Sequence, residues 1–354
     1  MSGGKPWLPE RVLVTRSAMA WDHGRGIAER AAALGIAVET LGSDRLALAL
    51  PDDPRRAYAE AKRTLAVTVA PPSKLRLQPI APSADWRVDL AEGCPAHCSY
   101  CYLAGSLKGP PITRAYANLP EIIAALPAYL GEGTITSRSA ARAGEGTTYE
   151  ASCYTDPLAL EHLTGSLSTL IAAFGQWQAP VQLRFTTKFD AVDPLLALDH
   201  QGRTRMRASI NPALFARYEG GTSPVAARLA ALSRMARAGY PVGLTIAPII
   251  LADGWQAAYG GLIAQAGERL RDVPGIDCTI ELITHRYTPG SKAVLDSWYP
   301  GSGLDMGGAN RSEKRTKFGS VKHVYDAVTM KALRSFFETA IARELPFARI
   351  LYGT

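Results

Sequence analysis

The chain has 354 residues, a net charge of +7 and five cysteines, and 47 % of its residues are hydrophobic against 20 % charged. This composition predicts a globular protein with a sizeable core, and it excludes a helical membrane protein because no apolar run reaches the roughly 18 residues of a span. Five cysteines are too few for a disulfide scaffold and, without an apolar leader segment, predict reduced thiols and a cytoplasmic location.

The chain begins with a small α/β unit. Strands are expected at 11–15 and 37–40, with a helix over 21–36 between them, and residues 58–69 pass from helical spacing into strand spacing. The stretch that follows, 70–83, is rich in Pro and Ser and is interpreted as a linker.

After the linker, strand-like and helix-like segments alternate, which is typical of a parallel sheet with helices outside it. Strands are expected at 86–90, 147–152, 181–187, 205–210, 242–250 and 278–283. Helical patterns are expected near 119–130, 157–174, 192–198, 224–238 and 256–271. Six such units predict an α/β fold with a partial (β/α)6 barrel of the TIM type, whose active site lies at the C-terminal ends of the strands.

Two further segments complete the predicted organisation. Residues 131–148 are small, polar and Gly-rich and predict a flexible surface insertion without chemistry. Residues 299–325 have no helical period and predict a hairpin or irregular element before a last helix near 327–343. The expected domains are an N-terminal unit with its linker (1–83), the barrel (84–298) and a C-terminal hairpin-plus-helix extension (299–354).

Three of the five cysteines form a C-x₃-C-x₂-C motif in the loop after the first barrel strand, at Cys94, Cys98 and Cys101. A structural zinc site needs four ligands, and although His97 lies inside the motif, no second CxxC or HxxxH follows. A buried apolar cysteine cluster is another alternative, but the Gly, Pro, His and Ser of the motif favour a loop. Three thiolates would bind three irons of a [4Fe–4S] cluster and leave the fourth open for a reacting ligand.

The motif, with an aromatic residue before its last cysteine and a barrel around it, resembles the radical S-adenosylmethionine superfamily, in which the open iron chelates the methionine moiety. Longer stretches over nearly the whole chain resemble one family of that superfamily, the spore photoproduct lyases, which repair a UV-induced thymine dimer. These stretches are far more specific than the cysteine triplet, and they cover residues 149–167, 183–196, 202–211, 219–232, 237–250 and 279–300.

The resemblance implies a lyase that converts spore photoproduct, 5-thyminyl-5,6-dihydrothymine, to two thymines. In that family a 5′-deoxyadenosyl radical takes a hydrogen atom from the lesion, and β-scission then breaks the thymine–thymine bond. Cys153 matches the cysteine that returns a hydrogen atom, and Tyr100 and Tyr102 match the tyrosines that pass the radical back to the cofactor. Without the resemblance, a cysteine at a strand end would more often be a small core residue.

The resemblance also assigns contacts with S-adenosylmethionine to residues at strand ends. Lys188 matches a lysine whose ammonium pairs with the cofactor carboxylate, and Ser209 matches a polar contact to the same ligand. Thr155 stands where the family has Ser and keeps the hydroxyl. Ala247 precedes Pro248 and would wall the adenine, although a strand-end turn is the equally good structural interpretation.

The partners implied are damaged DNA and an electron donor such as flavodoxin or ferredoxin, and the protein is expected to be a monomer away from membranes. The lesion must be extruded from the duplex, so a basic strip and an aromatic wedge are expected in the hairpin region. The net charge permits such a polyanionic partner, and a solvated basic loop is the alternative. The candidate DNA-binding residues are Arg311, Lys314, Arg315, Lys317, Phe318 and Lys322.

Two departures from the family concern the substrate rather than the reaction. Tyr154 follows Cys153 where the family has a small Thr, which is expected to crowd the hydrogen donor. The family's Arg-Tyr-Gly tip is Lys317-Phe318-Gly319 here, which loses the bidentate fork of Arg and the hydroxyl of Tyr. The alternatives are therefore a family member that acts on a different DNA lesion or a modified nucleoside and, from another class, a non-catalytic iron–sulfur or zinc protein that binds DNA.

Overall fold

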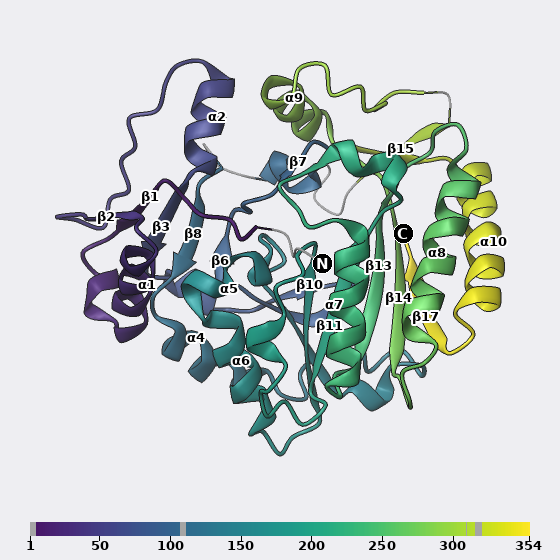
Figure 1. Cartoon of the computed structure of the whole chain (residues 1–354), viewed down its shortest axis with the longest axis horizontal. Helices are drawn as coiled ribbons and strands as arrows, with labels where there is room; N and C mark the ends of the chain where they lie inside the picture. Colours follow the sequence, from purple (N-terminus) through teal and green to yellow (C-terminus); the bar gives the residue numbers. More distant parts are fainter. Residues whose placement is uncertain (1–4, 107–110, 309, 316–320) are drawn as a thin grey trace.

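The computed structural model describes residues 5–106, 111–308, 310–315 and 321–354. Two sheets dominate the molecule, a small one near the N-terminus and a larger curled one that helices cover on the outside (Figure 1). Within the described residues, none of the helices combines the length and the apolar character that crossing a membrane requires.

The N-terminal sheet has the strand order β2-β1-β3-β8-β6 and is parallel except for the β6–β8 pair. Its strands are β1 (Arg11–Val14), β2 (Ala37–Thr40), β3 (Thr64–Thr68), β6 (Ala91–Glu92) and β8 (Thr113–Tyr116). Helix α1 (Asp22–Ala33) packs on this sheet through Ile27 and Ala31, which are fully buried against Val12 and Val14. Helix α2 (Pro54–Lys62) begins with Asp53, whose carboxylate accepts a hydrogen bond from the backbone N–H of Arg56.

The eight-stranded sheet confirms the predicted partial barrel. Its order is β17-β14-β13-β11-β10-β9-β5-β4, and the six predicted strands lie in it side by side, in chain order and parallel. They are β5 (Ala84–Val88), β9 (Thr147–Ala151), β10 (Val181–Thr187), β11 (Thr204–Ile210), β13 (Val242–Ile249) and β14 (Cys278–Thr284).

Both edges of this sheet come from segments in which no barrel strand was expected. The antiparallel strand β4 (Gln78–Ile80) lies in the predicted linker, next to the short helix α3 (Pro72–Leu75). The parallel strand β17 (Ala348–Gly353) comes from the C-terminal extension and lies beside β14 (Figure 1). Strands β6 and β8 lie after residue 83 but belong to the N-terminal sheet. The sheets thus include strands from both sides of the expected domain boundaries at 83 and 298, and these boundaries stay predictions.

The barrel helices lie where the pattern placed them, except that the helix expected near 192–198 is a short 3-10 turn and the one expected over 157–174 is divided. They are α4 (Leu119–Ala125), α5 (Pro157–Thr164), α6 (Ser166–Gly175), α7 (Val225–Arg237) and α8 (Trp255–Leu270), with 3-10 turns at Leu126–Tyr129, Asp193–Leu195 and Ala213–Tyr218. The helix expected over 157–174 is two helices, because Gly165 between them adopts a left-handed conformation with φ of 64°. Glycine takes this conformation without steric cost and ends the first helix.

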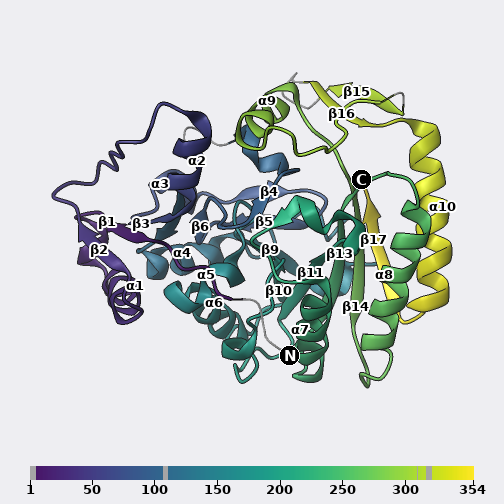
Figure 2. The ribbon, with the colours of Figure 1, turned by 45° about the horizontal axis from the view of Figure 1, so that its top comes forward.

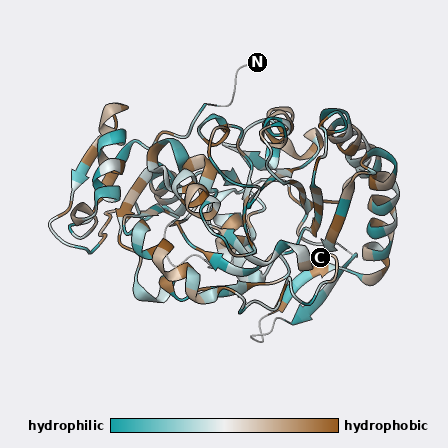
Figure 3. Cartoon of the chain, turned by 90° about the horizontal axis from the view of Figure 1, so that it is seen from below, coloured by the Kyte–Doolittle hydropathy of each residue, from teal (hydrophilic) through white to brown (hydrophobic). Residues whose placement is uncertain are grey.

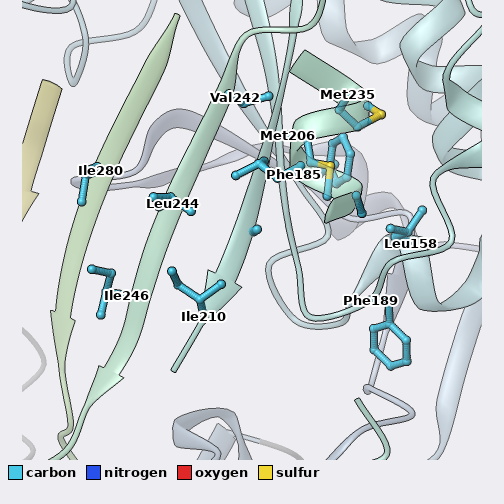
Figure 4. Close-up of a cluster of buried hydrophobic side chains, with 14 of the residues drawn as sticks. Leu158, Phe185, Phe189, Met206, Ile210, Met235, Val242, Leu244, Ile246 and Ile280 are labelled. Carbon is cyan, nitrogen blue, oxygen red and sulfur yellow. The ribbon is translucent and has the colours of Figure 1, made fainter. Parts of the chain in front are cut away.

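Apolar side chains from the strands and helices form the barrel core (Figure 4). Each such side chain, once fully buried, contributes about 2 kcal/mol. Figure 3 shows hydrophobic and hydrophilic residues mixed along both the strands and the surrounding helices; on the helices this is expected of elements with one buried face. The labelled core residues include Leu158, Phe185, Met206, Ile210, Met235, Val242, Leu244, Ile246 and Ile280.

The C-terminal extension contains the expected hairpin and the expected last helix. It follows helix α9 (Pro289–Trp298), an unexpected helix at the end of the predicted barrel region that begins with a capping box between Thr288 and Ser291. The hairpin pairs β15 (Arg311–Arg315) with β16 (Val321–Tyr325) in antiparallel register, and α10 (Ala327–Glu344) follows. Figure 2 shows the hairpin next to α9 and α10.

The Gly-rich insertion 131–148 is anchored on the barrel, which corrects the expectation of a flexible segment. The buried carboxylate of Asp85 accepts hydrogen bonds from the backbone N–H groups of Ile135 (2.7 Å) and Thr136 (3.1 Å). Arg142 is 4 % exposed and donates to the carbonyls of Pro82 and Ser83, both at 2.6 Å. Buried polar groups need hydrogen-bond partners. The contacts of Asp85 and Arg142 satisfy this need and fix a segment whose composition alone predicted flexibility.

Candidate active site

A cavity of about 420 Å³ lies at the C-terminal ends of the barrel strands. The fold brings together there all ten residues that the sequence assigned to the cluster, the cofactor and the radical chemistry. They are Cys94, Cys98, Tyr100, Cys101, Tyr102, Cys153, Thr155, Lys188, Ser209 and Ala247.

The cysteine loop is fixed by backbone contacts at both ends. Gly93 has a φ of 73°, and a Cβ there would lie 2.4 Å from the carbonyl oxygen of Ile112, so only glycine fits before the first cysteine. Further along, β7 (His97–Cys98) pairs antiparallel with β12 (Glu219–Gly220), which places Cys98 opposite Glu219. All three cysteines of the motif are free thiols and half-buried.

The loop thiols are held close enough to affect one another's ionisation. Burial raises the pKa of Cys94 to about 11 and that of Cys98 to about 12, and repulsion from the neighbouring motif thiols adds to the increase at both. The ammonium groups of Lys62 and Lys188 act in the opposite direction, on Cys94 and Cys98 respectively. A cationic metal centre between these thiols would favour all their thiolates at once. Within the described residues, no three His, Cys, Asp or Glu side chains form a group that could hold a single metal ion.

Three of the predicted cofactor contacts meet at one ammonium group. Lys188 Nζ donates to Ser209 Oγ (2.8 Å), to Glu219 Oε1 (2.9 Å) and to the carbonyl oxygen of Ala247 (3.1 Å). Sequence reasoning identified Lys188, Ser209 and Ala247 but assigned no role to Glu219, although this residue begins the stretch 219–232 that carries the family resemblance. A ligand carboxylate at this point would exchange with one of the acceptors that Lys188 now uses.

Glu219 is the electrostatic centre of this part of the cavity wall, and it is 6 % exposed. Burial by itself raises its pKa, but Lys188 and Arg228 more than offset this and lower the pKa to about 2. Arg228 Nη2 lies 2.7 Å from its second carboxylate oxygen, and the Tyr100 hydroxyl donates to its first. The carboxylate therefore stays ionised and fixes the orientation of both Lys188 and Tyr100.

Cys153 enters the cavity through a turn at the end of β9. Ser152 has a φ of 53°, a left-handed conformation that is costly for a residue with a side chain. Hydrogen bonds of Ser152 to Val88 and Leu90 of the neighbouring strand end (2.7 and 2.9 Å) hold it there. Burial, with a further contribution from the negative charge of Asp89, raises the pKa of the Cys153 thiol well above its usual range. The thiol is therefore protonated at neutral pH, which is the form that carries a transferable hydrogen atom.

Tyr154, which is expected to crowd Cys153, is not among the residues that line the cavity, whereas Cys153 and Thr155 are. The centroid of its ring is 4.5 Å from the guanidinium of Arg87 and 5.7 Å from Lys74 Nζ, and cation–π contacts of this kind hold the ring beside them. The charges of the same two cations also act on the Cys153 thiol. The effect of Tyr154 on the hydrogen donor therefore stays a prediction.

The Thr155 hydroxyl provides a test of whether the cavity suits a polar ligand. It is buried and has no hydrogen-bond partner among the described residues. Its neighbour Asp156 is fully engaged, since it caps α5 through the N–H of Ala159 and accepts the N–H of Lys188 at 2.7 Å. Buried hydroxyls in native proteins are normally satisfied. An unsatisfied hydroxyl in the same cavity as the three free thiols of the cysteine motif fits S-adenosylmethionine beside a [4Fe–4S] cluster.

The hairpin carries three of the predicted DNA-binding residues, Lys314, Arg315 and Lys322. Lys314 and Lys322 lie directly opposite each other across β15 and β16, and Arg315 is exposed. Like charges in facing positions destabilise a hairpin, and an anionic partner would relieve this repulsion. Lys317 and Phe318 of the predicted tip lie outside the described residues.

Arg311 has a different environment from the other basic residues of the hairpin. Its guanidinium donates to the carbonyl oxygen of His285 (2.6 Å), approaches His285 Nδ1 (3.0 Å) and lies 3.9 Å from the centroid of the Tyr325 ring. These contacts anchor the hairpin to the barrel through Arg311. The expected contact of Arg311 with DNA stays a prediction.

Sequence reasoning also missed Arg286, which connects the cavity to the hairpin. Arg286 lines the cavity, and its guanidinium lies 5.3 Å from the ring centroid of Tyr102, which is 40 % exposed. Its charge also contributes, after burial, to lowering the pKa of Lys322. The positive potential of the hairpin therefore continues to the mouth of the cavity.

Comparisons with known proteins agree with this geometry over the full chain. The family model of spore photoproduct lyase matches residues 7–354. The spore photoproduct lyase of Geobacillus sp. (strain Y412MC61) is 36 % identical over 352 residues, which cover 99 % of this chain and 100 % of that protein. The spore photoproduct lyase of Bacillus subtilis (strain 168) is 34 % identical over 351 residues, which cover 99 % of both.

Solved structures give the same result for the fold. A variant of spore photoproduct lyase with bound AdoMet and dinucleoside spore photoproduct superimposes with a TM-score of 0.90 at 34 % identity, covering 99 % of this chain and all of that one. A second structure, complexed with dinucleoside spore photoproduct, gives a TM-score of 0.89 with the same identity and coverage. The chain therefore belongs to the spore photoproduct lyase family.

Proposed function

We propose that this chain is a radical S-adenosylmethionine lyase that repairs DNA by converting spore photoproduct to two thymines. One observation carries the proposal: the cysteine motif, the Cys153 thiol and the Lys188 corner line a single cavity. Relatives that match the chain from end to end have been solved with AdoMet and dinucleoside spore photoproduct bound, and both ligands are expected here.

The residues of the cavity divide into two sets by the group that each would hold. Cys94, Cys98 and Cys101 would bind the [4Fe–4S] cluster. S-adenosylmethionine would contact Thr155, Lys188, Ser209 and Ala247. When bound, these two groups supply the 5′-deoxyadenosyl radical that takes a hydrogen atom from the lesion.

Cys153 is proposed to return a hydrogen atom to the thymine radical that remains after the carbon–carbon bond breaks. Its S–H bond breaks, a C–H bond forms on the thymine methylene, and one unpaired electron stays on the sulfur. The raised pKa of the thiol keeps this hydrogen in place at neutral pH. Tyr100 and Tyr102, which line the same cavity, are proposed to supply the hydrogen atom that restores the thiol.

Damaged DNA is proposed to bind over the hairpin, with Lys314, Arg315 and Lys322 contacting phosphates and the Lys317-Phe318 tip next to the extruded lesion. Arg286 at the mouth of the cavity would contact the lesion's own phosphate. We also propose a flavodoxin or ferredoxin as electron donor, and a monomer that works in the cytoplasm.

An anaerobic reaction tests the function directly. Reconstituted protein, dithionite, S-adenosylmethionine and a spore-photoproduct dinucleotide are mixed, and restored thymidylyl-thymidine and 5′-deoxyadenosine are followed by mass spectrometry. We expect both products with the wild type, and 5′-deoxyadenosine without repair in Cys153→Ala. The matched variant Cys278→Ala removes a buried core thiol and should keep repair.

The remaining outcomes point to the two alternatives. Cofactor cleavage without repair in the wild type would indicate another DNA lesion or a modified nucleoside as substrate. A protein that binds DNA but cleaves no cofactor would be the non-catalytic alternative, an iron–sulfur protein if it holds about four irons and a zinc protein if it holds about one zinc.

A further inference from the structure

Lys62 reaches the cysteine loop from outside the barrel. It is the last residue of α2 in the N-terminal unit, and only 6 % of its surface is exposed. Its ammonium donates to the carbonyl oxygen of Cys94 and, at 2.5 Å, to that of Ala96. The first cysteine of the motif is thus held through its backbone by a lysine far away in the sequence.

The charge of this lysine has no acidic partner in the part of the chain that the structure describes: no carboxylate forms an ion pair with Lys62. Its other near neighbour is the ring of Tyr58, with the centroid 5.6 Å from Nζ. A buried ammonium is costly unless negative charge offsets it. Two carbonyl dipoles supply part of that offset, and the thiolates of a bound cluster would supply the rest.

Tyr58, one turn earlier on α2, fixes the position of Lys62. Its hydroxyl lies 2.9 Å from His97 Nδ1 inside the cysteine motif and also contacts the hydroxyl of Tyr299. Its ring packs on Trp298 with centroids 4.7 Å apart. Figures 1 and 2 show the resulting arrangement, with α2 beside α9 above the loop. Helix α2 of the N-terminal unit therefore contacts the cysteine loop in two ways, through the ammonium group of Lys62 and through the hydroxyl group of Tyr58.

We propose that Lys62 is a positioning residue of the cluster site, which holds the Cys94–Ala96 backbone and raises the reduction potential of the bound cluster with its buried positive charge. The inference rests on the proposed function. Reduction adds a negative charge to the cluster, and a nearby cation in a medium of low dielectric constant stabilises the reduced state more than the oxidised one. Net charge and hydrogen bonding around a cluster are known to set its potential.

The test uses four variants of the full-length, reconstituted protein. Lys62→Met removes the charge and both donors, Lys62→Gln keeps a donor without the charge, and Lys62→Arg keeps the charge. Arg55→Met is the matched control, because Arg55 is an exposed cation on the same helix. The midpoint potential is measured by redox titration followed by electron paramagnetic resonance, and iron retention by exposure to a chelator.

We expect Lys62→Met and Lys62→Gln to lower the midpoint potential, and Lys62→Met to lose iron about tenfold faster, as changes around metal ligands commonly do. Lys62→Arg should restore the potential, and Arg55→Met should match the wild type. If Lys62→Met binds no cluster, the midpoint potentials of Lys62→Gln and Lys62→Arg are compared instead. Equal potentials in those two variants would overturn the electrostatic role.

Tyr58→Phe separates the charge from the hydroxyl network. It removes the contacts to His97 and Tyr299 and leaves Lys62 in place, so the potential should stay near that of the wild type while stability falls. A potential that shifts as far in Tyr58→Phe as in Lys62→Gln would contradict the assignment to Lys62. A wild type that binds no four-iron cluster would contradict the proposed function itself, an outcome that is separate from any difference between variants.

Discussion

The two sides of the cavity are built differently. On the side of the cysteine loop, buried charges and hydroxyls from several segments converge, with Glu219 joined to Lys188, Arg228 and Tyr100. On the side of the hairpin, basic residues face one another across a two-stranded ladder, and Arg311 anchors it to the barrel. The first side is suited to hold reacting groups in one geometry, and the second to attract an anion.

The largest difference between the sides should appear in stability. Glu219→Ala leaves the buried charges of Lys188 and Arg228 unpaired and should destabilise the protein by about 3–5 kcal/mol. Glu313→Ala, a matched change on the exposed face of β15, should stay within about 0.5 kcal/mol. Urea unfolding of both variants measures this, and equal effects would remove the distinction between the two sides.

A pH dependence belongs to the hairpin side. Burial, and then repulsion from Arg311, lowers the pKa of His285 from 6.5 to about 3. The folded protein keeps this histidine neutral while the unfolded chain takes up a proton below pH 6.5, so stability is lost as pH falls from about 6.5 towards 3. At pH 5 the loss relative to pH 7 is about 2 kcal/mol.

His285→Asn should remove that part of the pH dependence. Unfolding free energies at pH 7 and pH 5 are compared in the variant and the wild type, and the difference between the two pH values should shrink by about 2 kcal/mol. His323→Gln serves as the control, since His323 stacks on Tyr287 in the same region. A difference between the two pH values that is unchanged in His285→Asn would assign the effect to other buried histidines.

The same contrast explains what could be predicted from the sequence. The barrel strands were readable because each spans at least five residues and alternates with helical segments, and their order in a parallel sheet then placed Cys153, Lys188 and Ser209 at one rim. The edge strand β4 has three residues and β17 is half-exposed, so neither carries a periodic signal. These edge strands form because each pairs its backbone with an adjacent barrel strand, β4 with β5 and β17 with β14.

Partners supplied by distant contacts could not be predicted at all. No role was assigned to Glu219 or Lys62 from the sequence, because their contacts join residues more than thirty positions apart, Glu219 with Lys188 and Lys62 with the Cys94 carbonyl. The contacts of Arg311 with His285 were likewise invisible in the sequence, where Arg311 is one basic residue in a basic stretch. Composition gives the charge of a segment but not which charges are already used.

DNA affinity should depend on the hairpin side alone. Lys314→Ala combined with Lys322→Ala should weaken binding of a lesion-containing duplex about tenfold and reduce its salt dependence by about two phosphate contacts. Fluorescence anisotropy at several salt concentrations measures both. Repair of the dinucleotide, which lacks the flanking phosphates, should be unchanged. A repair rate that falls in parallel with affinity would mean that the hairpin also shapes the cavity.

The smallest effect is expected at Tyr154, the residue that follows the proposed hydrogen donor Cys153 in the sequence. Tyr154→Thr restores the family residue and removes the contacts with Arg87 and Lys74, at a cost of about 0.5–1 kcal/mol in stability. Repair should stay within about twofold, because Tyr154 is not among the residues that line the cavity. Tyr154→Phe keeps the ring and should match the wild type in both respects. A large gain or loss of repair in Tyr154→Thr alone would show that the ring reaches Cys153 during the reaction, and would make this position a determinant of substrate choice.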